Sequence, residues 1–171
     1  MERGYITVNT GDGKGKTTAA IGQALRALGA GFSVYVGQFL KSRNSGEIDA
    51  LQIFAPRVVT ELYGAQRQIG SPMTERDRHM AQAGMLRLSD ALYQGYDLVV
   101  ADEILVALSK GLLSEGQVLD LIHRKPESVE LILTGRGAPP SVMGAADVVT
   151  EMRAIQHHYR DGVLARVGIE R

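Results

Sequence analysis

The chain has 171 residues and no net charge at pH 7, which suits one domain and does not point to nucleic acid or a membrane surface as a partner. Its 44% hydrophobic and 22% charged residues are typical of a globular protein, and the absence of cysteine excludes disulfides and thiolate metal sites. No apolar run approaches the roughly 20 residues of a membrane span, no signal peptide is recognised before the first strand pattern, and a reducing, cytoplasmic location is expected.

Strand and helix patterns then alternate along the chain. Residues 5–8 form the first predicted strand, which leads into a glycine-rich turn. The predicted helices, recognised by apolar positions at helical spacing, are residues 16–28, 75–94 and 114–124. Thr74 and Ser114 are the expected N-caps of the last two. The other predicted strands are residues 33–40, 58–62, 97–102, 129–134, 148–152 and 163–169. Residues 41–71 are the least regular part, for which we expect mobile loops.

Several of the predicted strands are apolar at nearly every position. Strands that are covered by helices on both faces of a parallel sheet have this composition. We therefore expect an α/β fold in which residues 1–171 form one domain, with a mostly parallel sheet and helices on both faces, of the P-loop NTPase (RecA-like) type. The sequence contains no internal repeat and no recognisable domain linker.

A phosphate-binding loop is predicted between the first strand and the first helix. The pattern G-x-x-x-x-G-K-[ST] ends here in Gly15, Lys16 and Thr17, but its first position holds Thr10 instead of glycine. The glycines of the loop still let successive backbone N–H groups face an anion, and the following helix directs its positive dipole end toward the same point. Lys16 would supply a charge for phosphate oxygens and Thr17 a hydroxyl ligand for Mg²⁺. The alternative is a glycine-rich turn without function.

Charged residues follow three other predicted strands, at the edge where a parallel sheet gathers its ligands. Asp102 and Glu103 end an apolar strand, as expected of a carboxylate that organises a metal beside a P-loop; a turn or helix-capping acid is the alternative. Arg136 is placed to meet phosphate or developing negative charge, unless it is an ordinary surface arginine. Lys41 and Glu47 follow the second strand, either as part of the site or as solvated loop charges.

The neighbouring pair His157 and His158 suggests a ligand for a metal or for cobalt. Adjacent residues on a strand point to opposite faces, so the two rings would not easily share one metal. Surface or packing histidines are therefore the preferred interpretation.

Several short motifs together resemble the ATP:corrinoid adenosyltransferases of cobalamin synthesis and salvage. The segment Thr10–Ala20 is similar to the P-loop of that family, which also lacks the first glycine. The further matching motifs are Phe39-Leu40-Lys41, Gly46-Glu47, Leu98 to Glu103, Leu133 to Arg136 with Ala138-Pro139, Ala146 to Met152, and Gly168-Ile169-Glu170. They occur in order and cover nearly the whole chain, which makes the resemblance specific.

The resemblance implies a reaction, its substrates and its partners. Such enzymes transfer the 5′-deoxyadenosyl group of ATP to the cobalt of a reduced corrinoid and release triphosphate. They hold ATP in a reversed sense compared with ordinary NTPases, so that C5′ is attacked instead of the γ-phosphate. The resemblance also implies Mg²⁺ or Mn²⁺, a homodimer, and a flavin-type reductase that supplies the electron.

The resemblance also implies roles for single residues. Lys16, Thr17, Glu103 and Arg136 would carry catalysis, and Thr17 with Asp102 or Glu103 would bind the metal. Reduced cobalt is itself a strong nucleophile that needs no general base, which agrees with the lack of an obvious histidine–acid pair in the sequence. The protein would position the reactants and stabilise the leaving triphosphate. The residues expected to bind ATP are Thr10, Gly11, Asp12, Gly13, Lys14, Gly15, Lys16, Thr17, Thr18, Lys41 and Arg136.

One stretch departs from the family pattern. Many members have aromatic residues, often including tryptophan, between the third strand and the next helix, where they help to cover the corrin. Residues 62–73 contain Tyr63 but no tryptophan. Tyr63, Ile69 and Met73 are candidates for the apolar corrin face, with ordinary loop packing as the alternative. Two other functions stay open: an ATPase or kinase that acts at the γ-phosphate, and an ATP-binding regulatory module.

Overall fold

The computed structural model describes residues 1–43, 45–66, 71–158 and 162–170. Its elements, in chain order, are β1 (Ile6–Thr10), α1 (Lys16–Gly29), β2 (Val34–Phe39), α2 (Gly46–Leu51), the 3₁₀ helix η1 (Gln52–Phe54), β3 (Val58–Tyr63), α3 (Glu75–Ala91), β4 (Leu98–Asp102), α4 (Ile104–Ser109), α5 (Glu115–His123), β5 (Glu130–Thr134), α6 (Pro140–Gly144) and β6 (Val148–Glu151). Within these residues no helix is both long and apolar enough to cross a membrane.

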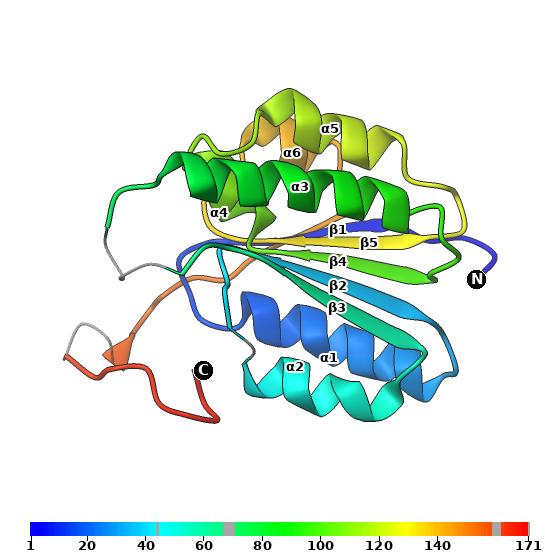
Figure 1. Cartoon of the computed structure of the whole chain (residues 1–171), viewed down its shortest axis with the longest axis horizontal. Coiled ribbons are helices and arrows are strands. Elements are labelled where there is room, and N and C mark those ends of the chain that lie inside the picture. The colour runs from blue at the N-terminus through cyan, green and yellow to red at the C-terminus, as the bar shows by residue number, and fades with distance from the viewer. Residues whose placement is uncertain (44, 67–70, 159–161, 171) are drawn as a thin grey trace.

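Six strands form one sheet in the order β3-β2-β4-β5-β1-β6, and every neighbouring pair is parallel. Helices α1 and α2 cover one face of this sheet, and α3, α4, α5 and α6 cover the other (Figure 1). The expected single α/β domain is thereby confirmed, with a sheet that is parallel throughout. Because all strands run in one direction, the loops after β1, β2, β4 and β5 meet at one edge, where such sheets bind their ligands.

The sheet separates two hydrophobic clusters. On one face, Ala20 and Ala24 of α1 pack with Val100 of β4, and all three are fully buried. On the other face, Leu88 of α3 and the neighbouring strand residue Val99 belong to the second cluster and are also fully buried. Successive residues of β4 thus enter opposite clusters, which explains why this strand is apolar at nearly every position.

Four short helices among the described residues, α2, η1, α4 and α6, are not predicted by the sequence pattern. The expected loop region 41–71 contains α2 and η1, so the expectation of loops is wrong there; α2 is fixed by two residues, Ile48 and Leu51, that are 1% and 2% exposed. Two apolar residues are too few to show the helical period from which a helix could be predicted. Helix α4 is hidden for the opposite reason, because its residues 104–108 are all apolar and leave no polar face. Helix α6 is a single short segment that begins with Pro140.

The C-terminal segment departs most from the sequence prediction. No strand forms at residues 163–169, where Leu164 and Val167 are 79% and 80% exposed, so that prediction is wrong. His157 and His158 do not lie on a strand either; their rings stack at 5.0 Å between centroids, so they do not point to opposite faces. The expected N-caps Thr74 and Ser114 are confirmed as capping boxes, although α3 ends at Ala91 instead of residue 94.

Candidate active site

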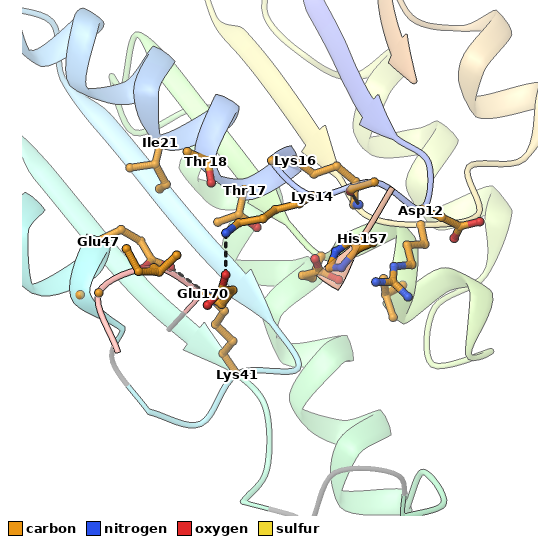
Figure 2. A pocket seen from close by; sticks show the side chains of 18 residues that line it. Asp12, Lys14, Lys16, Thr17, Thr18, Ile21, Lys41, Glu47, His157 and Glu170 are labelled. Atoms are coloured by element: carbon orange, nitrogen blue, oxygen red, sulfur yellow. Dashed lines mark hydrogen bonds and ion pairs between the residues drawn. The ribbon is translucent and has the colours of Figure 1, made fainter. Parts of the chain in front are cut away.

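A pocket of about 650 Å³ opens at the carboxyl ends of β1, β2, β4 and β5. This volume is in the range of pockets that bind nucleotides and drug-sized ligands. The pocket is lined by Asp12, Gly13, Lys14, Gly15, Lys16, Thr17, Thr18, Ile21, Lys41, Gly46, Glu47, Glu103, Val106, Arg136, His157, Gly168, Ile169 and Glu170. Figure 2 shows Lys14, Lys16 and Thr17 on one side of it, with Lys41 from the loop after β2 and Glu47 from the first turn of α2.

The glycine loop after β1 forms the floor of the pocket. Gly11 and Gly15 have φ angles of 93° and 116°, a left-handed conformation that favours glycine. Gly15 is the N-cap of α1 and contributes no side chain there. The N–H groups of the first helical turn have no partner within the helix, and an anion can accept from them. The loop therefore has the backbone geometry of a phosphate site.

The back of the loop is fixed by Met152, the residue after β6. The Met152 N–H donates to the Thr10 carbonyl at 2.8 Å, and the Met152 carbonyl accepts from the Gly13 N–H at 2.6 Å. A Cβ atom built on Gly13 would lie 2.7 Å from the Met152 carbonyl oxygen, and one on Gly11 would lie 2.4 Å from the same atom. Both glycines are therefore needed for contact with this segment, independently of any ligand.

Lys16 lies under the loop and is 6% exposed. Its ammonium group donates to the Gly13 carbonyl at 2.6 Å. Burial lowers the pKa of Lys16, and the positive charge of Arg136 lowers it further, whereas Glu103 and Asp12 raise it. A bound phosphate would add negative charge beside this ammonium group and so favour its charged form.

Asp102 is the centre of a buried polar network behind the pocket. Its Oδ1 accepts from the hydroxyl of Thr17 at 2.8 Å and from the hydroxyl of Thr134 at 2.6 Å. Its Oδ2 accepts from Nε2 of Gln38 at 2.9 Å. The Thr134 hydroxyl also accepts from the Glu103 N–H at 2.9 Å, which ties the end of β5 to the residue after β4. Asp102 is fully buried and reaches the pocket through Thr17.

Glu103 follows Asp102 and lines the pocket itself. Its φ of 59° lies in the left-handed region, which is uncommon for a residue with a side chain and clusters at functional sites. Burial raises the pKa of Glu103, and the neighbouring Asp102 raises it further, while Lys16 and Lys41 oppose this rise. A divalent cation would favour the charged carboxylate.

The donors around Thr17 fit a magnesium ion. The Thr17 hydroxyl and the Glu103 carboxylate line the pocket and are hard oxygen ligands of the kind that Mg²⁺ prefers, and Asp102 adds a second carboxylate behind Thr17. Among the described residues, no group of three or more His, Cys, Asp and Glu side chains is placed to hold a metal alone. Mg²⁺ is commonly held by one or two carboxylates together with substrate phosphates, so the residues present suit a metal that arrives with a nucleotide.

An ion pair between the loop after β2 and the first turn of α2 lies at the rim of the pocket. Lys41 Nζ lies 2.9 Å from Glu47 Oε1, and the Ser45 hydroxyl donates to the same oxygen at 2.6 Å. Burial tends to raise the pKa of Glu47, but the hydrogen bonds from Ser45 and Lys41 prevail and lower it to about 2. Both sequence candidates of this loop, Lys41 and Glu47, therefore lie at the pocket.

The opposite rim carries Arg136, an exposed residue that follows β5. It stands between Gly135 and Gly137, whose φ angles are 135° and 74°. A Cβ atom on Gly135 would lie 2.9 Å from the backbone nitrogen of Val106 in α4, so glycine is needed for close contact there. This turn brings the guanidinium group to the same pocket as the glycine loop.

The C-terminal segment returns to the pocket, which sequence reasoning missed. Glu170 accepts from Lys14 Nζ at 2.7 Å and also pairs with Arg166 and His158 (Figure 2 shows the contact with Lys14). Hydrogen bonds from Arg166 and Lys14 hold the pKa of Glu170 well below its usual value. In this structure a carboxylate therefore occupies the position beside a loop lysine where a phosphate oxygen is expected.

The structure brings most of the predicted binding residues together at one pocket. Thr10, Gly11 and Asp102 do not line it: Thr10 and Asp102 are buried behind it, and the Thr10 hydroxyl accepts from the Ala138 N–H at 3.3 Å. The residues that line the pocket but were not predicted as part of a site are Ile21, Gly46, Val106, His157, Gly168, Ile169 and Glu170. Gln38, which donates to Asp102 behind the pocket, was also not predicted. Its position as a polar residue in an otherwise apolar strand could have identified it.

The candidates for a corrin face are not supported as a group. Tyr63 is 5% exposed and packs in the cluster under α3, with its hydroxyl bonded to Tyr35 and Glu61, which agrees with the alternative of ordinary packing and not with a corrin face. Met73 is partly buried against the same cluster. Ile69 lies outside the described residues.

Comparison with known proteins agrees with this site. Residues 2–171 match the family described as ATP:corrinoid adenosyltransferase BtuR/CobO/CobP. The corrinoid adenosyltransferase of Pseudomonas aeruginosa is 36% identical over 171 residues, which are 99% of this chain and 84% of that protein. The corrinoid adenosyltransferase CobA of Salmonella typhimurium is 36% identical over 172 residues, which are 99% of this chain and 86% of that protein.

A solved structure supports the fold independently. The flagellar accessory protein FlaH of Methanocaldococcus jannaschii superposes with a TM-score of 0.59 at 12% identity, over 88% of this chain and 72% of that chain. Because the identity is so low, this likeness concerns the fold alone. The family match and the full-length relatives, together with the phosphate-binding loop, show that the chain belongs to the ATP:corrinoid adenosyltransferase family.

Proposed function

We propose that this protein transfers the 5′-deoxyadenosyl group of ATP to the cobalt of a reduced corrinoid. The observation that carries the proposal is the convergence of Lys14, Lys16, Lys41 and Arg136 on one pocket above the glycine loop. Four cationic side chains suit a triphosphate, which leaves with its full negative charge in this reaction. Membership of the adenosyltransferase family supports the same reaction.

The proposed chemistry is a displacement at carbon. The Co(I) centre donates an electron pair to C5′ of ATP, a cobalt–carbon bond forms, and the bond between C5′ and its oxygen breaks. The electron pair of that bond leaves on tripolyphosphate, and cobalt becomes formally Co(III). No proton has to be removed from the nucleophile, so positioning and stabilisation of the leaving group are the work left to the protein.

We assign the leaving group to the glycine loop and its cations. The N–H groups of Lys14 to Thr18 and the ammonium group of Lys16 would bind phosphate oxygens, whereas the Gly13 N–H donates to Met152 behind the loop. Lys14 and Arg136 would neutralise the charge that accumulates on tripolyphosphate. For tripolyphosphate to be the leaving group, C5′ of ATP has to face the nucleophile. In a kinase the γ-phosphate faces the nucleophile instead.

We assign Thr17, Asp102 and Glu103 to a divalent cation, with Mg²⁺ favoured by their oxygen donors. When bound, such an ion polarises phosphate oxygens and stabilises the leaving triphosphate. Thr17 would face the ion through its hydroxyl, which Asp102 holds in place at 2.8 Å. Glu103, which lines the same pocket, would supply a carboxylate to balance the charge of the ion.

The partners follow from the chemistry. A Co(I) corrinoid is a strong reductant, so an electron donor has to generate it close to the site, and we propose a reductase of flavin type, as the family resemblance implies. Such a reductase would work in a reducing, cytoplasmic setting, which agrees with the absence of cysteine from the chain. We also propose a homodimer, because the outermost strand β6 has all four of its residues exposed and pairs with β1 on one side only.

Product analysis tests the proposed reaction. The protein would be incubated without oxygen with ATP, Mg²⁺ and a chemically reduced corrinoid, and the absorption spectrum and phosphate products would be followed. We expect a light-sensitive adenosylated corrinoid and one equivalent of tripolyphosphate. ADP and orthophosphate at a substantial rate, without a light-sensitive product, would show a γ-phosphate enzyme instead. ATP binding with negligible turnover in every condition would indicate a regulatory module.

Two matched variants locate the activity in the pocket. Lys16→Ala removes a buried ammonium group from the loop, whereas Lys110→Ala removes an exposed one at the end of α4. We expect the first variant to lose adenosylation and the second to keep it. Equal activity in both variants would mean that the reaction occurs elsewhere on the protein.

A further inference from the structure

A row of polar residues crosses the sheet under the first turn of α1. Gln38 is the penultimate residue of β2 and lies directly opposite Asp102 of β4, and Thr134 ends the next strand, β5. All three residues are fully buried. Their neighbours along the same strands, such as Val36 and Val100, belong to the apolar cluster under α1. Gln38 is thus an isolated exception in an otherwise apolar strand.

The hydrogen bonds of Asp102 fix the orientation of the Gln38 amide. A charged carboxylate only accepts hydrogen bonds, so the Gln38 NH₂ group has to face Asp102 Oδ2, at 2.9 Å. The Gln38 carbonyl oxygen then points away from Asp102. This oxygen is buried and has no hydrogen-bond partner among the described residues.

An unpaired buried carbonyl oxygen destabilises the folded protein, because it has lost its hydrogen bonds with water. An apolar side chain of similar size at position 38 would avoid that loss and continue the apolar pattern of β2. A native residue with such a disadvantage calls for a reason beyond packing. The side-chain hydrogen bond from Gln38 to Asp102 points to that reason.

We propose that Gln38 is a positioning residue that holds the Asp102 carboxylate in the orientation needed for the metal. The inference rests on the proposed function of Thr17 and Asp102 in binding Mg²⁺ with ATP. Thr17 and Thr134 both donate to Oδ1, whereas Gln38 donates to Oδ2. The terminal torsion of an aspartate is broad, so a carboxylate held at one oxygen can turn and exchange its oxygens. Gln38 prevents this rotation by holding the second oxygen.

Holding Asp102 in place also fixes the direction of the Thr17 hydroxyl, and with it the lone pairs of the Thr17 oxygen at the pocket. The Thr17 hydroxyl donates its hydrogen bond to Asp102 Oδ1, so the lone pairs of the Thr17 oxygen can face a cation. Without Gln38, Asp102 samples other orientations, and the Thr17 hydroxyl is oriented for only part of the time. Mg²⁺ demands nearly ideal octahedral geometry, so its binding is sensitive to this loss of order.

The test separates a positioning role from a structural one. Gln38→Met keeps the length of the side chain and removes both polar atoms. ATP binding would be measured by calorimetry without metal and at increasing MgCl₂, and the thermal midpoint of the metal-free protein would be measured alongside. We expect unchanged ATP affinity without metal, an apparent Mg²⁺ requirement raised about threefold to tenfold, and a thermal midpoint that is equal or higher.

A matched substitution serves as the control. Gln82→Met removes an amide that donates to the Leu112 carbonyl, away from the pocket. We expect it to lower the thermal midpoint without changing the Mg²⁺ requirement. Gln38→Leu provides a second variant if the methionine packs poorly, and the same result is expected for it.

Each other outcome overturns the inference. An unchanged Mg²⁺ requirement in a folded Gln38 variant gives the residue no part in metal positioning. Equal loss of ATP affinity with and without Mg²⁺ indicates general damage to the pocket. If the wild-type protein itself binds ATP with no Mg²⁺ dependence, the proposed metal site fails as well, and this result is distinguishable because it precedes any variant.

Discussion

Gly13→Ala probes how tightly the phosphate loop is fitted against the segment behind it. A Cβ atom at this position would lie 2.7 Å from the carbonyl carbon and oxygen of Met152 and 2.8 Å from the carbonyl carbon of Arg153. Gly13 does not have a positive φ angle, so the substitution acts through this contact and not through backbone torsion. Both neighbours are main-chain atoms, which cannot turn aside as a side chain can.

The expected magnitude follows from these distances. Ordinary van der Waals contact begins at 3.4 Å, so the 2.7 Å contact requires a displacement of about 0.7 Å of the loop or of the segment after β6. Overpacking of this kind destabilises a protein by about 1–3 kcal/mol. A displacement of about 1 Å in a catalytic arrangement can reduce the rate by about 100-fold. We therefore expect ATP affinity and adenosylation to fall by about 10- to 100-fold.

Calorimetric titration with ATP and Mg²⁺ measures the affinity, and thermal unfolding measures the stability. Gly22→Ala in α1 is the matched control, because nothing lies within 4 Å of a Cβ atom at that position. Alanine is a better helix former than glycine, so the control should gain about 0.5–1 kcal/mol in stability and keep its ATP affinity. Wild-type affinity in Gly13→Ala would refute the inference that contact with Met152 sets the position of the loop.

Four further predictions concern charged groups of the pocket. Lys16→Ala should weaken ATP binding by at least about 100-fold in calorimetry, because a desolvated charge partner of phosphate is lost; near-normal affinity would contradict the P-loop assignment. Glu103→Ala should lose Mg²⁺-dependent turnover with an unchanged circular dichroism spectrum, and an unaltered metal dependence would move the role elsewhere. Glu170→Gln should bind tripolyphosphate more tightly than the wild type, because a carboxylate no longer competes for Lys14; weaker binding would show that Glu170 supports the ligand instead. Glu47 has a pKa of about 2 in the folded protein, below its ordinary 4.5, so its stabilising effect is present above pH 4.5 and lost as the pH falls through 2. The free energy of unfolding in urea should therefore be about 1 kcal/mol higher for the wild type than for Glu47→Gln at pH 6, and this difference should vanish near pH 2.

The parts of the site that the sequence predicts are those with local chemistry. The glycine loop, Lys16 and Thr17 are recognisable because strand, loop and helix follow one another directly in residues 6–29. Glu103 and Arg136 are predictable for a related reason, since a parallel sheet collects the carboxyl ends of its strands at one edge. Their convergence on one pocket follows once the strands are known to be parallel.

The parts that the sequence does not predict depend on contacts between distant residues. Glu170 meets Lys14 across a separation of 156 positions, and nothing near either residue indicates the partner. Gln38 stands in an apolar strand and gains its meaning from Asp102 in the neighbouring strand. For Tyr63 the sequence leaves two interpretations open, the corrin face and ordinary packing, and the choice depends on Gly84 of α3, which leaves room for its ring in the core.

The two hydrogen bonds of Met152 join the phosphate loop to the end of the outermost strand, β6. The loop can therefore become disordered only together with the separation of β6. The Gly13 N–H donates to the Met152 carbonyl. It can therefore exchange its hydrogen with solvent only when the end of β6 separates from the loop. Its exchange rate in the native protein therefore measures the free energy of that local opening. A nucleotide bound on the pocket side of the loop would slow this exchange from the opposite side, which makes the Gly13 amide an internal reporter of occupancy.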